Sequence, residues 1–501
     1  MAITQSPRRL HARHWPRALA AVVVLGVTSF LVPALRAQQQ RQQGAAPGEP
    51  KRPGYDTVAT TETNVVDGFT LVAVGDVIIG RPITKLQDPA FQAVLKILRS
   101  ADVTFGNMEG SLFDIQDFKG WPEAEYGGAW HLGPPAVGKD LKALGFNVMA
   151  RANNHALDWG VEGMRQTTKV LNEVGIAHAG AGEDAAHAGA AAYLETERGR
   201  VSLVSFATSY TPLSRAAAPA GEAPGRPGLN ALRLTRTAIV TRDMLDNLRR
   251  VRDALPRGPR TAEQEKQEKP DELTLLGTRY KVGDKPAFAF QPDERDVKEI
   301  LRNVRNGKQL SDFCIVTDHG HEPGNWSQEP PDFLQQFAHQ AIDAGADAFI
   351  VHGPHQLRGI EIYKGRPIFY SLGNFVFDDK IFPVGQDLYD IHKMDPRTMT
   401  DGDLNAALMA KGFSDENLYQ GIVTLSRFEH NQLAEIRLYP IDLGYTVRLA
   451  DRGVPRLASP ALARTILERL QKLSQPYGTT ISIEQTVGII RVAPAARSTG
   501  N

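Results

Sequence analysis

Several histidines of this sequence directly follow predicted strands. Of 13 histidines, five have this position: His155, His319, His321, His352 and His355. Two carboxylates and one amide hold equivalent positions: Asp76, Glu109 and Asn154. Imidazole and carboxylate ligands together suit Mn, Fe or Zn. The residue types therefore predict a centre for one or two divalent ions, which could activate water against an ester or amide while a remaining histidine acts as general acid.

The stretch around which these residues are organised covers residues 345–377. Ala348–Val351 is an apolar run of strand length, and the histidine loop His352-Gly353-Pro354-His355 ends it. Two strand-like segments follow, Gly359–Tyr363 and Pro367–Tyr370, on either side of a hairpin-like turn. Two imidazoles three residues apart on a stiff loop can point at one ion. A pair of ordinary loop histidines is the alternative, since this spacing is a weak pattern by itself.

The elements that must position these residues alternate between strand and helix. Apolar runs predict strands at 69–74, 102–105, 146–150, 176–179, 201–207 and 312–317. Helical spacing predicts helices at 90–99, 140–144, 161–174, 237–256, 293–304, 330–344 and 457–473. This alternation indicates an α/β fold with largely parallel pairing, in which sites form at the carboxyl ends of the strands. One Asp or Asn after a strand could be an ordinary turn residue, but several in succession favour a site.

Other segments predict little regular structure. Residues 209–235 predict a long irregular loop, 257–272 a solvated turn and 378–419 a loop-rich extension. A closing hairpin is expected from Gly421–Phe428 and Ala434–Pro440.

The N-terminus has the layout of an export signal. Arginines precede an uncharged run from Ala18 to Pro33, which small residues follow. The run is short for a membrane span of about 20 residues, so we expect cleavage, with retention as an anchor as the alternative. We therefore expect an exported protein that is periplasmic or membrane-anchored and faces outwards. Residues 38–64 predict a flexible linker because they are rich in Gln, Pro, Gly and Thr.

Composition excludes several classes of function. The 57 basic and 57 acidic residues cancel, and no basic stripe indicates a nucleic-acid partner. No phosphate loop or dinucleotide fingerprint is present, and Ser371 lacks the setting of a nucleophile elbow. The single cysteine, Cys314, excludes an intrachain disulfide and is expected in the core.

Four stretches carry a family resemblance. They read VAVGDVIIGRP at 72–82, ADVTFGNMEGSL at 101–112, ARANNHALDWG at 150–160 and GADAFIVHGPHQLRGIEIYKGRPIFYSLGNFVFD at 345–378. In this order they resemble the CapA family of bacterial capsule-synthesis proteins, which is associated with poly-γ-glutamate and related to calcineurin-like metallophosphatases. The resemblance implies a four-layer α/β/β/α sandwich with its site at one edge of two sheets.

The resemblance also implies roles for single residues. Asp76 and Glu109 look like metal carboxylates, with Glu109 the better candidate for a bridge. Asn154 is similar to a metal-binding asparagine and His155 to a general acid, so His155 and Asp76 are the implied catalytic residues. The implied imidazole ligands are His319, His352 and His355, with His321 as an alternative to His319.

Two departures from the family pattern bear on this site. The first strand ends Asp76-Val77-Ile78, without the histidine that metallophosphatases place two residues after the aspartate. This departure implies that one metal position is weaker or absent. The segment Asp318-His319-Gly320-His321-Glu322 leaves open which histidine binds, with Asp318 as a substitute.

Our leading hypothesis is an exported metal-dependent hydrolase of envelope polymer metabolism. Its substrate would be an anionic polymer such as poly-γ-glutamate, or a small anionic molecule, and the candidate binding residues are Arg81, Asn107, Arg151, Arg226 and Asn374, with Arg358 nearby. A non-catalytic component of a capsule synthase or export complex is one alternative. A metallophosphoesterase acting on a nucleotide or lipid phosphate is another.

The resulting domain plan has four parts. We expect an export signal or anchor at 1–37, a linker at 38–64, a metallophosphatase-fold domain at 65–445 and a C-terminal extension at 446–501. A variable insert is expected near 209–292.

Overall fold

The structure is a computed structural model. It describes residues 63–123, 130–256, 269–378 and 382–492. The predicted export signal and almost all of the predicted linker lie outside the described residues. Within the described ranges, no helix is both long and apolar enough to cross a membrane.

The first of two large sheets has ten strands. Its order is β23-β24-β21-β20-β1-β2-β5-β6, with β19 beside β1 and β22 beside β21. The strands are β1 (Phe69–Ile78), β2 (Val103–Met108), β5 (Val148–Ala150), β6 (Ala177–Ala179), β19 (Asn374–Phe377), β20 (Gln420–Glu429), β21 (Gln432–Asp442), β22 (Arg456–Leu457), β23 (Ser482–Glu484) and β24 (Val487–Arg491). β1, β2, β5, β6 and β19 run parallel, so their carboxyl ends meet at one edge.

The second large sheet has six strands in the order β17-β18-β16-β15-β9-β8. They are β8 (Ala192–Thr196), β9 (Gly199–Ala207), β15 (Phe313–His319), β16 (Ala348–His352), β17 (Ile360–Tyr363) and β18 (Arg366–Phe369). β9, β15, β16 and β18 are parallel. Strands β1 and β15 are buried along almost their whole length, as expected for near-continuous apolar runs in the middle of such sheets.

The two sheets pack face to face on an apolar core. Phe69, Phe313 and Phe428 meet there, with the Phe313 ring centroid 4.9 Å from that of Phe69 and 4.8 Å from that of Phe428. Alternate residues of β1 point the other way, so that Val72 and Val74 belong to a second core under helices. The sheets are therefore buried on both faces.

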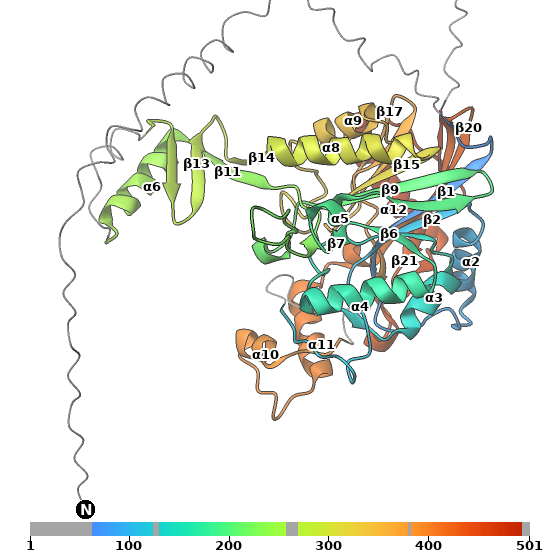
Figure 1. Cartoon of the computed structure of the whole chain (residues 1–501), viewed down its shortest axis with the longest axis horizontal. Helices are drawn as coiled ribbons and strands as arrows, with labels where there is room; N and C mark the ends of the chain where they lie inside the picture. The colour runs from blue at the N-terminus through green and yellow to red at the C-terminus, as the bar shows by residue number, and fades with distance from the viewer. Residues whose placement is uncertain (1–62, 124–129, 257–268, 379–381, 493–501) are drawn as a thin grey trace, which may run out of the picture. The chain divides into compact units, whose positions relative to one another are not determined.

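Helices cover the outer faces of both sheets (Figure 1). α2 (Pro89–Leu98), α3 (Ala136–Leu144) and α4 (Gly160–Glu173) pack on the first sheet, and α8 (Glu294–Gln309) and α9 (Leu334–Asp343) pack on the second. α12 (Pro460–Ser474) closes one side of the core between the sheets. Side-chain caps fix where helices begin, as at Asp88 for α2 and Asp293 for α8. This arrangement confirms the predicted α/β/β/α sandwich.

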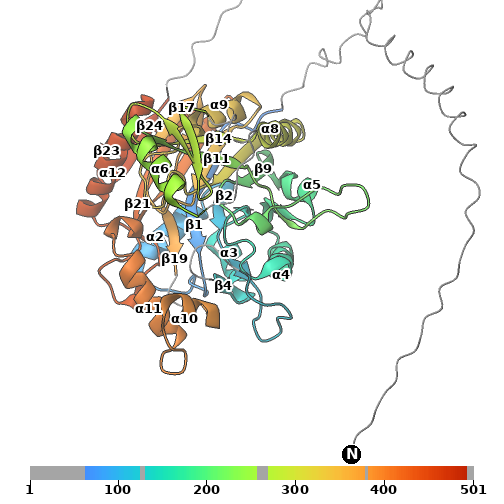
Figure 2. The same ribbon diagram turned by 90° about the vertical axis from the view of Figure 1, so that its left-hand side faces the viewer.

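A separate small sheet lies within the predicted insert. Its order is β12-β13-β11-β14, and its strands are β11 (Leu234–Val240), β12 (Glu272–Leu275), β13 (Thr278–Val282) and β14 (Ala287–Pro292). α6 (Arg242–Ala254) packs on it. The prediction of a helix over 237–256 was therefore wrong at its start, since residues 237–240 belong to β11. Figure 2 views the molecule from the side of this sheet.

Shorter elements complete the chain. Two-stranded pairs form between β3 (Ser111–Leu112) and β4 (Leu132–Gly133), and between β7 (Ala181–Gly182) and β10 (Gly228–Leu229), and α5 (Ala185–Gly189) is a short helix. α10 (Gln386–His392) and α11 (Asp401–Gly412) lie where a loop-rich extension was expected, so that prediction was wrong for the residues of these two helices. A capping box at Thr400 and Asp403 begins α11.

Replacing Phe313 with alanine should lower the free energy of unfolding by about 3–5 kcal/mol, because it leaves a cavity between the sheets. Urea denaturation would measure this change. Phe288→Ala is the control, since Phe288 is 49% exposed and its truncation should cost far less. Equal losses in both variants would contradict the assigned core.

The Cys314 thiol should not react with a disulfide reagent at pH 8 until the protein unfolds. It is fully buried, and burial raises its pKa to about 12, so that the reactive thiolate is scarce. A colorimetric thiol assay with and without denaturant checks this. Rapid labelling of the native protein would show that β15 is accessible.

Candidate metal centre

The predicted ligands gather where strands of both sheets end. Asp76 lies near the end of β1, and Glu109 directly follows β2. His319 and His352 are the last residues of β15 and β16 and are paired across the parallel ladder. Parallel pairing therefore brings residues far apart in sequence to one edge.

Three of these residues form a first group of donors. Asp76, His319 and His352 each offer a ligand atom, and these atoms lie within 4.8 Å of one another. The Nδ1 atoms of the two histidines are 2.9 Å apart. Asp76 Oδ1 is 4.0 Å from Nδ1 of His319 and 3.9 Å from Nδ1 of His352. All three side chains are fully buried. This spacing is that of ligands around one ion.

A second group adjoins the first. Glu109, His321 and His355 also have ligand atoms within 4.8 Å of one another. The groups touch: His319 Nε2 is 3.8 Å from Glu109 Oε1, and His355 Nδ1 is 3.8 Å from Asp76 Oδ2. His319 and His321, between which the sequence left the choice open, are thus divided between the groups. The histidine missing after Asp76 does not leave the first group short of imidazoles.

Burial holds the imidazoles in the form that binds metals. It lowers the pKa of His352 to about 4, despite the opposing effect of Asp76. The pKa values of His319 and His321 fall well below their ordinary range, because of burial and then of the neighbouring histidines. At neutral pH these rings are neutral and can donate a lone pair to a cation.

Amide groups surround the ligands. Asn107 Nδ2 donates to Asp76 Oδ1 at 2.9 Å, and Asn153 Nδ2 donates to Asn107 Oδ1 at 3.0 Å. Asn154 Oδ1 lies 2.7 Å from His319 Nε2, and Asn374 Oδ1 lies 2.8 Å from His355 Nδ1. Two predicted substrate residues, Asn107 and Asn374, therefore contact ligands and orient them.

The backbone at the site is constrained as well. Gly353 has φ of 112°, and its N–H donates to Asp76 Oδ2 at 3.1 Å. His355 has φ of 54°, which is rare for a residue with a side chain. A Cβ on Gly75 would stand 1.8 Å from the Gly373 carbonyl oxygen, so β1 and the turn before β19 meet closely only because Gly75 has no side chain.

His155 lies beside the two groups as part of a buried dyad. Its Nδ1 is 2.7 Å from Asp158 Oδ2, and its Nε2 is 4.0 Å from Glu109 Oε1. The ring stacks on that of His131 at 3.9 Å between centroids. The backbone N–H of His131 donates to Asp158 Oδ2 at 3.1 Å. The arrangement directs Nε2 of His155 towards the carboxylate edge, as a general acid requires.

The predicted substrate arginines lie in different environments. Arg81 pairs with Asp378 at 3.3 Å, and Arg226 donates to the Arg215 carbonyl. Arg151 and Arg358 are fully buried, which lowers the pKa of each to about 10, and Arg358 donates to backbone carbonyls, including that of Glu322. None of them lines the pocket that opens beside His321.

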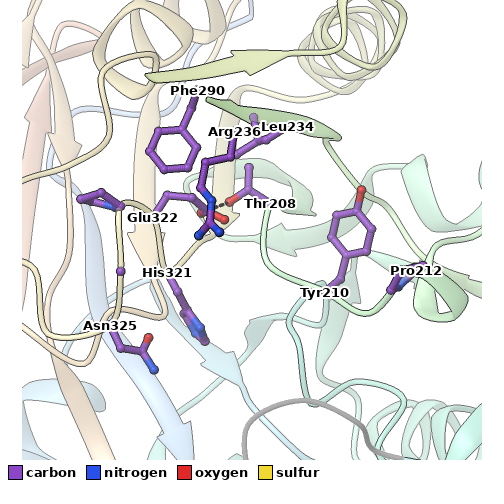
Figure 3. A pocket seen from close by; sticks show the side chains of 11 residues that line it. Thr208, Tyr210, Pro212, Leu234, Arg236, Phe290, His321, Glu322 and Asn325 are labelled. Carbon is purple, nitrogen blue, oxygen red and sulfur yellow. Dashed lines mark hydrogen bonds between the residues drawn. The ribbon is translucent and has the colours of Figure 1, made fainter. Parts of the chain in front are cut away.

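That pocket has a volume of about 510 Å³ and is shown in Figure 3. Loops after β9 and β15 form one side of it, and β11 and β14 of the insert form the other. His321 and Arg236 both line it. The ligand group around His321 is thus next to a space large enough for a small organic ligand.

Sequence reasoning missed four residues of this region: His131, Asn153, Asp158 and Arg236. The pair Asn153 and Asp158 had a signal, since both stand in the stretch Asn-Asn-His-Ala-Leu-Asp. His131 and Arg236 had none, because they reach the site from loops and strands whose placement depends on tertiary packing.

Comparisons with known proteins identify the family of the chain. The chain matches the model of the family described as Bacterial capsule synthesis protein PGA_cap over residues 70–379. It is 57% identical over 449 residues to an uncharacterized protein of Sinorhizobium fredii, covering 87% of this chain and 96% of the relative.

Two relatives whose names state a role are less similar to the chain. The capsule biosynthesis protein CapA of Bacillus anthracis is 26% identical over 328 residues, covering 64% of this chain and 63% of the relative. The PGA biosynthesis protein CapA of Bacillus subtilis is 27% identical over 315 residues, covering 61% of this chain and 62% of the relative. The family match covers more than half of the chain and includes both ligand groups. The chain therefore belongs to the bacterial capsule synthesis protein family PGA_cap.

Proposed function

We propose that this protein is a metal-dependent hydrolase that cleaves an amide or ester bond in an anionic envelope polymer. The observation that carries the proposal is two adjoining, buried ligand groups beside the His155–Asp158 dyad. The names of the two Bacillus relatives, which refer to capsule and PGA biosynthesis, support a polymer of this class.

The donor chemistry fits two divalent ions of the Mn, Fe or Zn type. Asp76, His319 and His352 would hold one, and Glu109, His321 and His355 the other. Asn154 Oδ1 contacts Nε2 of His319 at 2.7 Å and so orients this ring, whose Nδ1 faces Asp76. When bound, such ions polarise the scissile carbonyl and lower the pKa of water.

The residues of the chain supply orientation and a proton. Asp158 accepts from Nδ1–H of His155, which fixes the tautomer and leaves Nε2 facing the reacting centre. Protonated at Nε2, His155 can give its proton to the leaving amine or alkoxide. Stacking on His131 keeps the ring from turning away. The Asn107 amide and the Gly353 N–H hold the Asp76 carboxylate in place.

We further propose that the protein is exported and acts with the capsule synthesis or export machinery. The basic, apolar and small-residue layout of the N-terminus supports this, as does the family. The direct test of hydrolysis is release of new amine ends from poly-γ-glutamate by the purified, metal-loaded protein. Turnover of generic phosphodiesters instead would favour a phosphoesterase.

Metal analysis of the purified protein should find close to two divalent ions per chain, one for each group. His352→Ala should lose the first, and His355→Ala the second, because each removes one of three protein donors. His339→Ala is the matched control, since His339 pairs with Glu361 outside both groups. A protein that stays metal-free after loading would instead favour a binding or assembly role.

Asp158→Asn should lower kcat by about 10²- to 10³-fold with unchanged metal content, because the general acid loses its orientation. Asp184→Asn is the control. Asp184 contacts His187 Nδ1 at 2.8 Å with the same three-residue separation, but at the surface. If both variants kept wild-type kcat, His155 would not be the acid.

A further inference from the structure

The pocket beside His321 is built by two parts of the chain. Thr208, Tyr210 and Pro212 come from the loop after β9, and residues 321–325 come from the loop after β15. The opposite wall consists of Leu234, Arg236 and Phe290. Figure 3 shows the Arg236 side chain reaching into the pocket towards Thr208 and Glu322.

One face of the insert sheet supplies that wall. Arg236 pairs with Phe290 across β11 and β14, so both side chains leave the sheet on the same face. Phe288, two residues along, lies on this face too, with the Arg236 guanidinium 5.2 Å from its ring centroid. Aromatic contact restricts the guanidinium without neutralising it. The insert thus presents a positioned cation to the pocket that His321 also lines.

The charge of Arg236 is not matched by the described residues. None of them places a carboxylate within ion-pair distance of it, whereas Arg233 nearby pairs with Asp293 at 3.0 Å and Asp296 at 2.7 Å. The one acidic residue lining the pocket, Glu322, accepts from the hydroxyls of Thr208 at 2.8 Å and Ser209 at 3.1 Å.

This charge pattern favours one kind of oxyanion. A guanidinium binds a carboxylate or a phosphate through paired N–H groups. The nearby Glu322 repels a dianionic phosphate more strongly than a monoanionic carboxylate, and its carboxylate can accept from an amide N–H. The pocket therefore suits a monoanionic carboxylate next to an amide.

We propose that Arg236 and the insert form a carboxylate-binding subsite that holds a neighbouring unit of the polymer while its scissile bond lies at the metal centre. The proposal rests on the proposed function for the identity of that centre. Arg236 acts as a specificity residue, because it contacts the substrate away from the reacting bond.

The test is titration calorimetry on zinc-loaded full-length protein with two probes. One is a γ-linked glutamate trimer, and the other is the same trimer with every α-carboxylate converted to a carboxamide. The wild type should prefer the charged trimer, and Arg236→Gln should weaken its binding by about 10- to 100-fold while leaving the neutral trimer unchanged.

Arg279→Gln is the matched control. Arg279 is exposed on the same sheet and pairs with Thr237, so its side chain leaves the opposite face from that of Arg236. It should keep wild-type affinity for both probes. Metal content and thermal midpoint are measured for all variants, because an unchanged fold and metal load assign the loss to the subsite.

Three results would overturn the proposal. One is equal affinity of Arg236→Gln and wild type for the charged trimer. Another is equal weakening of both probes. The third is tighter binding of inorganic phosphate than of the charged trimer, with phosphate displacing the trimer and Arg236→Gln abolishing the effect. That result would assign the subsite to phosphate.

Binding and hydrolysis fail separately in this design. Arg236-dependent binding without any turnover would retain the subsite and refute the hydrolase. Turnover that is the same in wild type and Arg236→Gln, and the same for both probes, would retain the hydrolase and refute the subsite.

Discussion

Burial of two carboxylates at the meeting edge of two sheets is the constraint on which the site depends. Asp76 and Glu109 are fully buried, and removing an ionised carboxylate from water is costly unless it is paired or hydrogen-bonded. The protein compensates Asp76 with the Asn107 amide and the Gly353 N–H. It surrounds both carboxylates with imidazoles that burial keeps neutral, as the lowered pKa values of His319 and His321 indicate. Carboxylate oxygens and neutral imidazole nitrogens gathered in this way are the donors that a divalent cation takes.

Local sequence predicted the alternation of strands and helices and the strand ends at which the candidate ligands stand, whereas the two-sheet sandwich was implied by the family resemblance. Strand ends such as Gly75-Asp76 and Asn153-Asn154-His155 can be predicted, because an apolar run stops there at a cluster of polar residues. The insert sheet was missed because β12 and β13 are short and mix polar with apolar residues, so that neither resembles a core strand. The division of the ligands into two groups could not be predicted from the sequence either. It depends on the pairing of His319 with His352 and on the docking of two sheets, neither of which is encoded in spacing.

Burial, rather than motif, distinguishes two copies of the same pattern. His155 with Asp158 and His187 with Asp184 have the same separation and nearly equal contact distances, 2.7 and 2.8 Å. The first pair is buried against Glu109, while the side chain of His187 is mostly exposed. The arginines divide similarly, since Arg151 is sealed inside the fold and Arg236 stands in an accessible pocket. Residue type alone therefore could not show which of these histidines and arginines lie at the candidate site.

The ligands of each group come from both sheets, with the carboxylates on the first and the imidazoles on or after strands of the second. An ion held across them therefore links occupancy to the docking of the sheets, because the complete donor set exists only in the native state. Each tenfold rise of free ion above its dissociation constant adds about 1.4 kcal/mol to the free energy of unfolding. Chains starved of the ion would unfold more often and meet proteases more often. Metal supply would then set how much of the folded protein persists.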